Sequence, residues 1–174
     1  MLGLLRRSRQ DKAAAALYAA AVAAARAPAY YTALGVPDTL DGRFDLLGLH
    51  VYLLIRRMNA EAPALAQALF DAMFRDMDHN LRELGVGDLS VAKRVKEMWE
   101  AFHGRAAAYE AGFAAPDPAL AQALARNVWR AEGHPHAAAL AAAARAQAAH
   151  LAAQPIGAFT AGSAGFLPAE RVLA

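Results

Sequence analysis

Apolar residues recur along this chain at the spacing of an α-helix, and no useful length of it alternates with the period of two that marks a β-strand. Hydrophobic residues make up 57% of the sequence, and much of that share is alanine, which favours helix because it loses no side-chain entropy there. A chain of 174 residues is long enough to bury one substantial core. We therefore predict an all-α fold, a single helical-bundle domain of about six helices.

Proline, glycine and capping residues divide the chain into the expected helices. The expected helices cover residues 11–27, 44–55, 63–84, 89–112, 117–132 and 135–154. Residues 1–10 are expected to form a basic and apolar N-terminal segment, and residues 11–154 the helical domain. Residues 155–174 show little periodicity, so we expect a loosely structured C-terminal tail there.

The longest strongly apolar run extends from Phe44 to Ile55 and is followed by two arginines. It is much shorter than the roughly 20 residues that span a bilayer. Apolar residues occur on all sides of it, which is typical of a helix buried at the centre of a bundle. His50 lies inside this run, and we interpret it as a hydrogen-bonded core histidine in preference to a ligand.

Composition excludes several kinds of chemistry. The sequence has no cysteine, which removes disulfides, zinc–thiolate sites, iron–sulfur clusters and thiol nucleophiles. The net charge of +2 is too mild to indicate a nucleic-acid partner. No phosphate-binding loop, nucleophile elbow or dinucleotide fingerprint occurs, and Asp76, Asn80 and Glu83 lack the spacing of a calcium loop. We expect no enzymatic activity, no cofactor and no metal.

The positive charge of the chain gathers at its N-terminus, where apolar residues precede basic ones. This order is the reverse of a secretory signal, so we expect a cytoplasmic protein. One interpretation of the segment is a frayed terminus. The other is a weak contact with the inner face of the cytoplasmic membrane, in which leucines insert and arginines face the headgroups. The residues of that contact would be Leu2, Leu4, Leu5, Arg6, Arg7 and Arg9.

Several polar residues fall on or beside the apolar faces of two consecutive expected helices. Asp76, Asn80 and Glu83 follow one edge of the first, and Arg94 and Arg105 project from the apolar face of the second. A buried guanidinium without an acceptor is costly. Because a tight turn makes the two helices antiparallel neighbours, we expect Arg94 near Glu83 and Arg105 near Asp76.

Two interpretations of this set remain open. In the first, the charges form a buried ionic network that fixes the register of the two helices. In the second, they line a groove that receives a partner or ligand, and methionines give it adaptable apolar contact. The expected apolar lining consists of Phe70, Met73, Met77, Met98, Phe102 and Tyr109.

The most specific stretch of the sequence is YYTALGVPDTLDGRFD at residues 30–45. Further blocks follow in order, namely LHV at 49–51, FD at 70–71, DMDHNLRELGVGD at 76–88, FHGR at 102–105 with Tyr109, and RNV at 126–128. Together these blocks resemble the ubiquinol-cytochrome c chaperone family, which contains the mitochondrial cytochrome b assembly factor. The resemblance covers roughly residues 17–130.

The resemblance implies an all-helical, non-enzymatic assembly chaperone for the cytochrome bc1 complex. Its partner would be cytochrome b or another subunit of that complex, which it would shield while newly made. The chain lacks the long leader of mitochondrial members, so we expect a bacterial cytoplasmic form. The motif residues of the loop before the buried helix are Tyr31, Asp38, Asp41, Gly42, Arg43 and Phe44.

Two other functional classes stay open at the level of sequence. One is a helical binding protein that encloses a lipid, quinone or haem-related compound between residues 44 and 112. The other is an enzyme that uses the carboxylates of Asp76 and Glu83, which would require a substrate pocket beside them.

Overall fold

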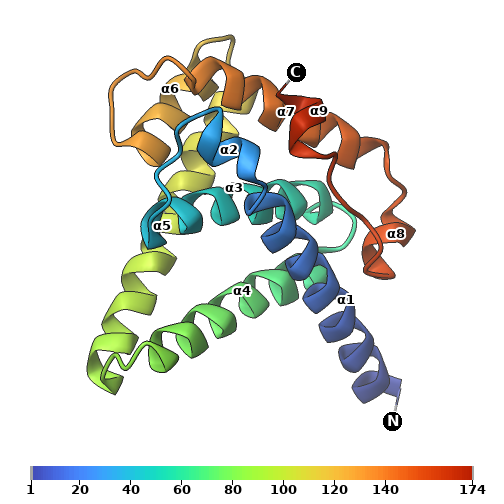
Figure 1. Ribbon diagram of the computed structural model, residues 1–174. Coiled ribbons are helices and arrows are strands. Elements are labelled where there is room, and N and C mark those ends of the chain that lie inside the picture. The colour runs from blue at the N-terminus through green and yellow to red at the C-terminus, as the bar shows by residue number, and fades with distance from the viewer. Residues whose placement is uncertain (1, 174) are drawn as a thin grey trace.

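The computed structural model describes the backbone of residues 2–173 and all of their side chains except those of residues 2–8 and 89. Within that range the chain consists of helices and connecting loops, without a β-strand, which confirms the all-α prediction (Figure 1). The helices are α1 (Leu2–Ala25), α2 (Pro28–Thr32), α3 (Leu40–Met58), α4 (Pro63–Glu83), α5 (Asp88–Ala114), α6 (Ala119–Leu124), the π-helical turn η1 (Ala125–Trp129), α7 (Ala137–Ala153), α8 (Ile156–Thr160) and α9 (Ala169–Val172).

Helix α3 lies at the centre of the molecule. It contacts α1, α4, α5, α7 and η1, and every residue from Phe44 to Leu54 is buried. The helix starts after Thr39, whose hydroxyl accepts a hydrogen bond from the Gly42 backbone amide at 3.2 Å, as an N-cap residue does. The predicted central helix is therefore confirmed, and it begins four residues earlier than the apolar run suggested.

His50 is a core residue, as predicted. Its side chain is buried, and its Nδ1 donates to the Leu46 carbonyl oxygen at 2.8 Å. Tyr30 and Phe166 pack against its ring edge-to-face on two sides, with centroid distances of 5.5 and 5.0 Å. Burial lowers the pKa of His50 to about 4, so the imidazole is neutral at physiological pH.

Helices α4 and α5 are joined by a turn in which Gly85 adopts a positive φ of 76°. From this turn the two helices diverge (Figure 1). Aromatic side chains bridge the space between them, since the Phe102 ring lies 5.5 Å from that of Phe70 and 6.4 Å from that of Phe74. Helix α3 also packs against both helices. The helices are thus consecutive and in contact, but they are not the closely paired hairpin that the sequence suggested.

The C-terminal residues 155–173 pack against the domain, so the prediction of a loose tail is wrong for them. Phe159 of α8 is fully buried. The Gln147 side chain bonds both the amide and the carbonyl of Leu167, and Gln154 does the same for Gly165. Hydrogen bonds from glutamine side chains to an irregular backbone leave no periodic signal, which is why the pattern of residues did not predict them.

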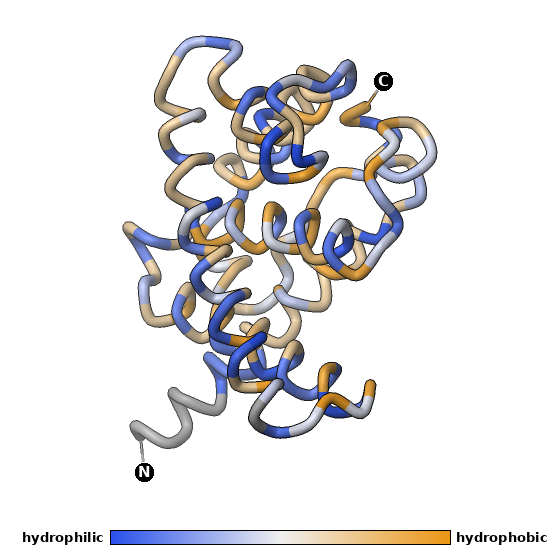
Figure 2. The backbone as a smooth tube through the Cα atoms, turned by 90° about the vertical axis from the view of Figure 1, so that its left-hand side faces the viewer, coloured by the Kyte–Doolittle hydropathy of each residue, from blue (hydrophilic) through white to orange (hydrophobic). Residues whose placement is uncertain are grey.

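The predicted N-terminal segment is not a separate unit of backbone, because α1 runs continuously from Leu2. The proposed lipid-contact side chains from Leu2 to Arg7 lie outside the described residues, and Arg9 is exposed. Among the residues that the structure describes, no helix combines the length and the apolarity needed to cross a bilayer (Figure 2).

Gly104 lies within α5, where an added Cβ would meet no atom within 4 Å. A glycine in a helix interior costs backbone entropy relative to alanine. We therefore expect Gly104→Ala to raise the free energy of unfolding by about 0.5–1 kcal/mol. Urea denaturation followed by circular dichroism measures this, and an unchanged or lower midpoint would contradict it.

Candidate functional site

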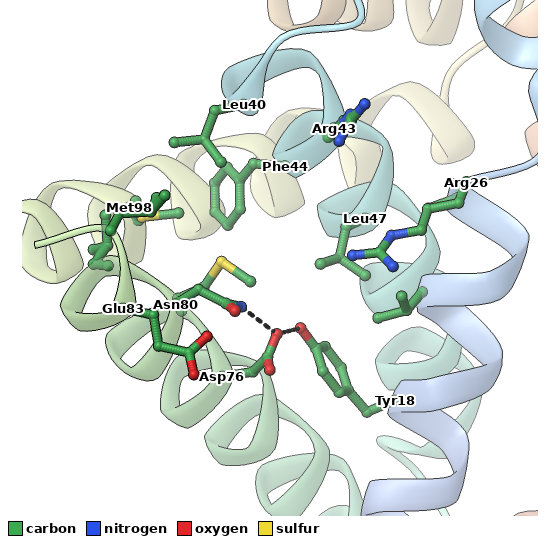
Figure 3. Close-up of a pocket in the computed structure, with 15 residues that line it drawn as sticks. Tyr18, Arg26, Leu40, Arg43, Phe44, Leu47, Asp76, Asn80, Glu83 and Met98 are labelled. Carbon is green, nitrogen blue, oxygen red and sulfur yellow. Dashed lines mark hydrogen bonds between the residues drawn. The ribbon is translucent and has the colours of Figure 1, made fainter.

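A cavity of about 320 Å³ opens to solvent between α1, α3, α4 and α5 (Figure 3). Its walls are mainly apolar, and its apolar lining comes from Val22, Ala25, Leu40, Phe44, Leu47, Met77, Leu81, Leu84 and Met98. Leu40 and Leu84 are 55% and 67% exposed, which is unusual for large aliphatic side chains. The cavity therefore presents apolar surface that the fold itself leaves uncovered.

One wall of the cavity carries a polar relay between α1 and α4. The Tyr18 hydroxyl donates to Asp76 Oδ2 at 2.7 Å, and Asn80 Nδ2 donates to the same oxygen at 3.0 Å (Figure 3). Burial raises the pKa of Tyr18 far above its usual value, and the hydrogen bond to Asp76 adds to the effect. The phenol thus stays protonated and acts as a hydrogen-bond donor, not as a base.

Arginines and carboxylates both line the cavity. Arg26, which directly follows α1, and Arg43 of α3 lie on one side, and Asp76 and Glu83 of α4 lie on the other (Figure 3). Arg43 pairs with Asp38 at 2.6 Å. The cavity therefore has an apolar interior with polar groups at its edges.

A second, more polar opening of about 510 Å³ adjoins this cavity and shares part of its apolar lining. We call it the basic groove, lined by Asp41, Lys93, Arg94, Glu97, Arg105 and Arg130 together with Ser90 and apolar residues. It shares four lining residues with the cavity, which are Leu40, Phe44, Leu81 and Met98. A ligand lying across these shared residues would touch both openings.

Asp45 lies beneath the basic groove and is only 1% exposed. Its carboxylate contacts Arg105 Nη2 at 2.7 Å and Arg130 Nη1 at 2.6 Å. Burial raises the pKa of the Asp45 carboxyl, and the two guanidiniums oppose that rise. The Arg105 guanidinium also stacks over the Phe44 ring, 5.5 Å from its centroid. This triad ties α3 to α5 and to the segment after η1.

The ion pairs differ from those expected between α4 and α5. Arg105 reaches Asp45 of α3 and not Asp76, because α3 lies against α5 where the two helices diverge. Arg94 is exposed and forms no ion pair with any acid that the structure describes, so its placement in an apolar face was wrong. Glu83 is also exposed and pairs with His79 at 3.2 Å.

The predicted apolar lining divides between cavity and core. Met77 and Met98 line the cavity. Met73, Phe102 and Tyr109 are buried in the core, and Phe70 is half-buried against Phe102, so none of these four lines the opening. A helical pattern identifies an apolar face but does not tell which end of that face a neighbouring helix covers.

The motif loop positions the start of α3 beside both openings. Phe44 lines both of them, Arg43 lines the cavity and Asp41 lines the basic groove. The remaining motif residues hold the loop itself. Tyr31 donates its hydroxyl to the Ala25 carbonyl at 2.9 Å, Asp38 pairs with Arg43, and Gly42 packs its Cα against Pro37.

Sequence reasoning missed Tyr18, Asp45 and Arg130 as members of the site. A signal for Asp45 was present, since an acid inside a fully buried apolar run requires cationic partners. Tyr18 lies in an alanine-rich helix, where one polar aromatic residue gives no indication of its partner in α4. Arg130 lies just outside a motif block, with a left-handed backbone at φ 57°.

Comparison with known proteins adds independent findings. Residues 32–166 match the family described as ubiquinol-cytochrome C chaperone. A Xenopus laevis protein named ubiquinol-cytochrome-c reductase complex assembly factor 1 is 26% identical over 102 residues, which make up 57% of this chain and 51% of the relative. The chain thus spans about half the length of the curated relative that it matches.

The fold is also similar to that of a solved structure. The crystal structure of the Cbp3 homolog from Brucella abortus matches with a TM-score of 0.82 and 42% sequence identity. The match covers 95% of this chain and 96% of the other.

Proposed function

The chain belongs to the ubiquinol-cytochrome C chaperone family, and we propose that it is a non-enzymatic assembly chaperone that shields newly made cytochrome b or a similar membrane subunit of the cytochrome bc1 complex. The observation that carries this proposal is the open apolar cavity with exposed Leu40 and Leu84 at its edge. Before it inserts, a membrane subunit exposes apolar side chains that need temporary cover. An exposed apolar opening on the chaperone supplies such cover.

The size of the cavity fits a reversible contact. A volume of about 320 Å³ accommodates a few large apolar side chains and not a whole transmembrane helix. Burying one leucine-sized side chain contributes about 1.5–3 kcal/mol. A few such anchors give useful affinity while still permitting release, which a chaperone must achieve for each client molecule.

Substitutions at the edge of the cavity test this proposal. We expect Leu40→Asn combined with Leu84→Asn to reduce co-purification of newly made cytochrome b by about tenfold or more, because two exposed apolar contacts are lost. The melting temperature should change little, since both side chains are largely in solvent. Quantitative pull-down from cells complemented with each variant measures the effect.

Trp99→Asn provides the matched control, because Trp99 is also an exposed large hydrophobic residue but lines neither opening. It should leave client recovery unchanged. Equal recovery with the double variant and with wild type would rule out the cavity as the contact. Normal bc1 content in a deletion strain would overturn the chaperone function itself.

A second candidate, a binding protein for a small amphipathic molecule such as a lipid, quinone or haem-related compound, is supported by the polar relay on the cavity wall. Tyr18, Asp76 and Asn80 give an apolar pocket the few convergent polar groups that orient small ligands. Native mass spectrometry of freshly purified protein distinguishes the two functions. A retained hydrophobic ligand supports the second, and a bare polypeptide supports the first.

A further inference from the structure

The basic groove carries cations that the fold leaves incompletely neutralised. Arg105 and Arg130 share the single carboxylate of Asp45. Lys93 lies 3.8 Å from Glu97, the longest of the ion pairs within the described residues, and Arg94 has no acid partner there. Asp41 is the other acid of the groove lining. The groove therefore holds an excess of positive charge that an incoming group can use.

The groove is continuous with the apolar cavity. Leu40, Phe44 and Met98, which Figure 3 labels among the residues that line the cavity, also line the groove, as does Leu81. A segment whose apolar side chains enter the cavity would extend directly over the cations of α5. Charge complementarity at this point requires acidic side chains next to the apolar anchors.

The spacing of the cations favours a polypeptide over a single phosphate headgroup. From Lys93 to Arg105 the groove follows α5 for about 18 Å, at a rise of 1.5 Å per residue. A phosphate is bound by donors that converge on one point, often in a bidentate geometry. Lys93 and Arg94 at one end of this stretch, and the half-exposed Arg130 beside Arg105 at the other, instead match carboxylates distributed along a second chain.

We propose that the segment bound by the cavity carries acidic residues beside its apolar anchors, and that the basic groove recognises them. This inference rests on the proposed function, since it concerns the same client. Exposed charges of this kind contribute modestly to affinity and more to selectivity and association rate. The groove thus selects, among apolar segments, those flanked by acidic residues.

Two lysines of α5 provide a matched pair of variants. Lys93 lines the groove and Lys96 lines neither opening. Each has an acid four residues later, at 3.8 and 3.7 Å, and their side chains are 79% and 76% exposed. Lys93→Glu and Lys96→Glu therefore change charge and helix environment equally, and they differ in their position relative to the groove. Arg94→Glu adds a second substitution inside the groove.

The test uses the full chain and two fluorescent synthetic peptides with the same leucine-rich apolar run, one flanked by three aspartates and the other by three lysines. Fluorescence anisotropy gives the dissociation constants at low and physiological salt. We expect the aspartate peptide to bind about tenfold more tightly at low salt, with the difference shrinking as salt rises. Lys93→Glu and Arg94→Glu should each remove about fivefold of that preference, and Lys96→Glu little of it.

The possible outcomes separate this inference from the proposed function. If both peptides bind equally to the wild type, the charge selection is wrong while apolar shielding stands. If neither peptide binds, both the proposed shielding function and the charge selection are wrong. If Lys93→Glu and Lys96→Glu have the same effect, the preference reflects the overall charge and the groove is not its cause. Vesicles of anionic or neutral phospholipid form a further arm, and loss of vesicle binding in Arg94→Glu with equal peptide affinities would assign the groove to lipid.

Discussion

Replacing Asp45 with alanine is expected to lower the free energy of unfolding by about 3–5 kcal/mol. The carboxylate is 1% exposed and contacts two guanidiniums, at 2.6 and 2.7 Å. Its removal leaves Arg105, which is largely buried, without a counter-charge, and a buried unpaired charge is among the most destabilising changes known. Urea unfolding monitored by circular dichroism at pH 7 measures the loss.

Asp41→Ala is the matched control for this prediction. Asp41 lies one helical turn before Asp45 in α3, is exposed, and forms no ion pair among the described residues. The same substitution there should change stability by less than about 0.5 kcal/mol. If Asp45→Ala also fell within that range, the carboxylate would not be the link between α3, α5 and the segment after η1.

Replacing Arg105 or Arg130 with alanine should lower the free energy of unfolding by less than Asp45→Ala does in the same assay. Arg130 is half exposed, and its guanidinium also donates to the Asn127 carbonyl, so solvent can replace part of its role. Arg105 is largely buried and also stacks on Phe44, so its loss should cost more. The order follows from burial, because desolvation determines what an unpaired charge costs.

Periodicity was sufficient to predict the longer helices and the burial of α3, but not the short helices α2, α8 and α9. Apolar residues on every side of residues 44–55 require a central position, and the structure has this segment buried among five other elements. The same reasoning predicted His50 as a core residue. These predictions depend only on which side chains avoid water, a property that the local sequence encodes.

Periodicity was insufficient for the ion pairs of the site. A helical wheel gives the direction of Arg105 relative to α5, but its partner depends on how α3 and α5 cross. Asp45 and Arg130 are 85 residues apart, and Tyr18 and Asp76 are 58 apart, so no local pattern connects them.

The methionines of the cavity were identifiable as apolar from the sequence. Which apolar residues line the cavity and which lie in the core depends instead on the divergence of α4 from α5.

Gly42→Ala is expected to destabilise the protein by about 2–3 kcal/mol, although alanine is the better helix former. An added Cβ at this position would lie 2.0 Å from the Pro37 carbonyl oxygen, far inside van der Waals contact. The blocking atom belongs to the backbone, so relief requires the whole motif loop to move. That movement would break the Thr39 cap and displace Phe44 from the wall shared by the two openings.

Gly104→Ala separates the clash from the intrinsic preference of the helix, because it makes the same change in α5 where an added Cβ meets nothing. Opposite signs of the two stability changes, measured by urea denaturation, would show that the loop packs on Gly42 as described. If both variants were more stable than wild type, the motif loop would move away from the added Cβ of residue 42 without loss of stability. In that case Phe44 would be held by α3 alone, and the motif loop would not determine the shape of the cavity.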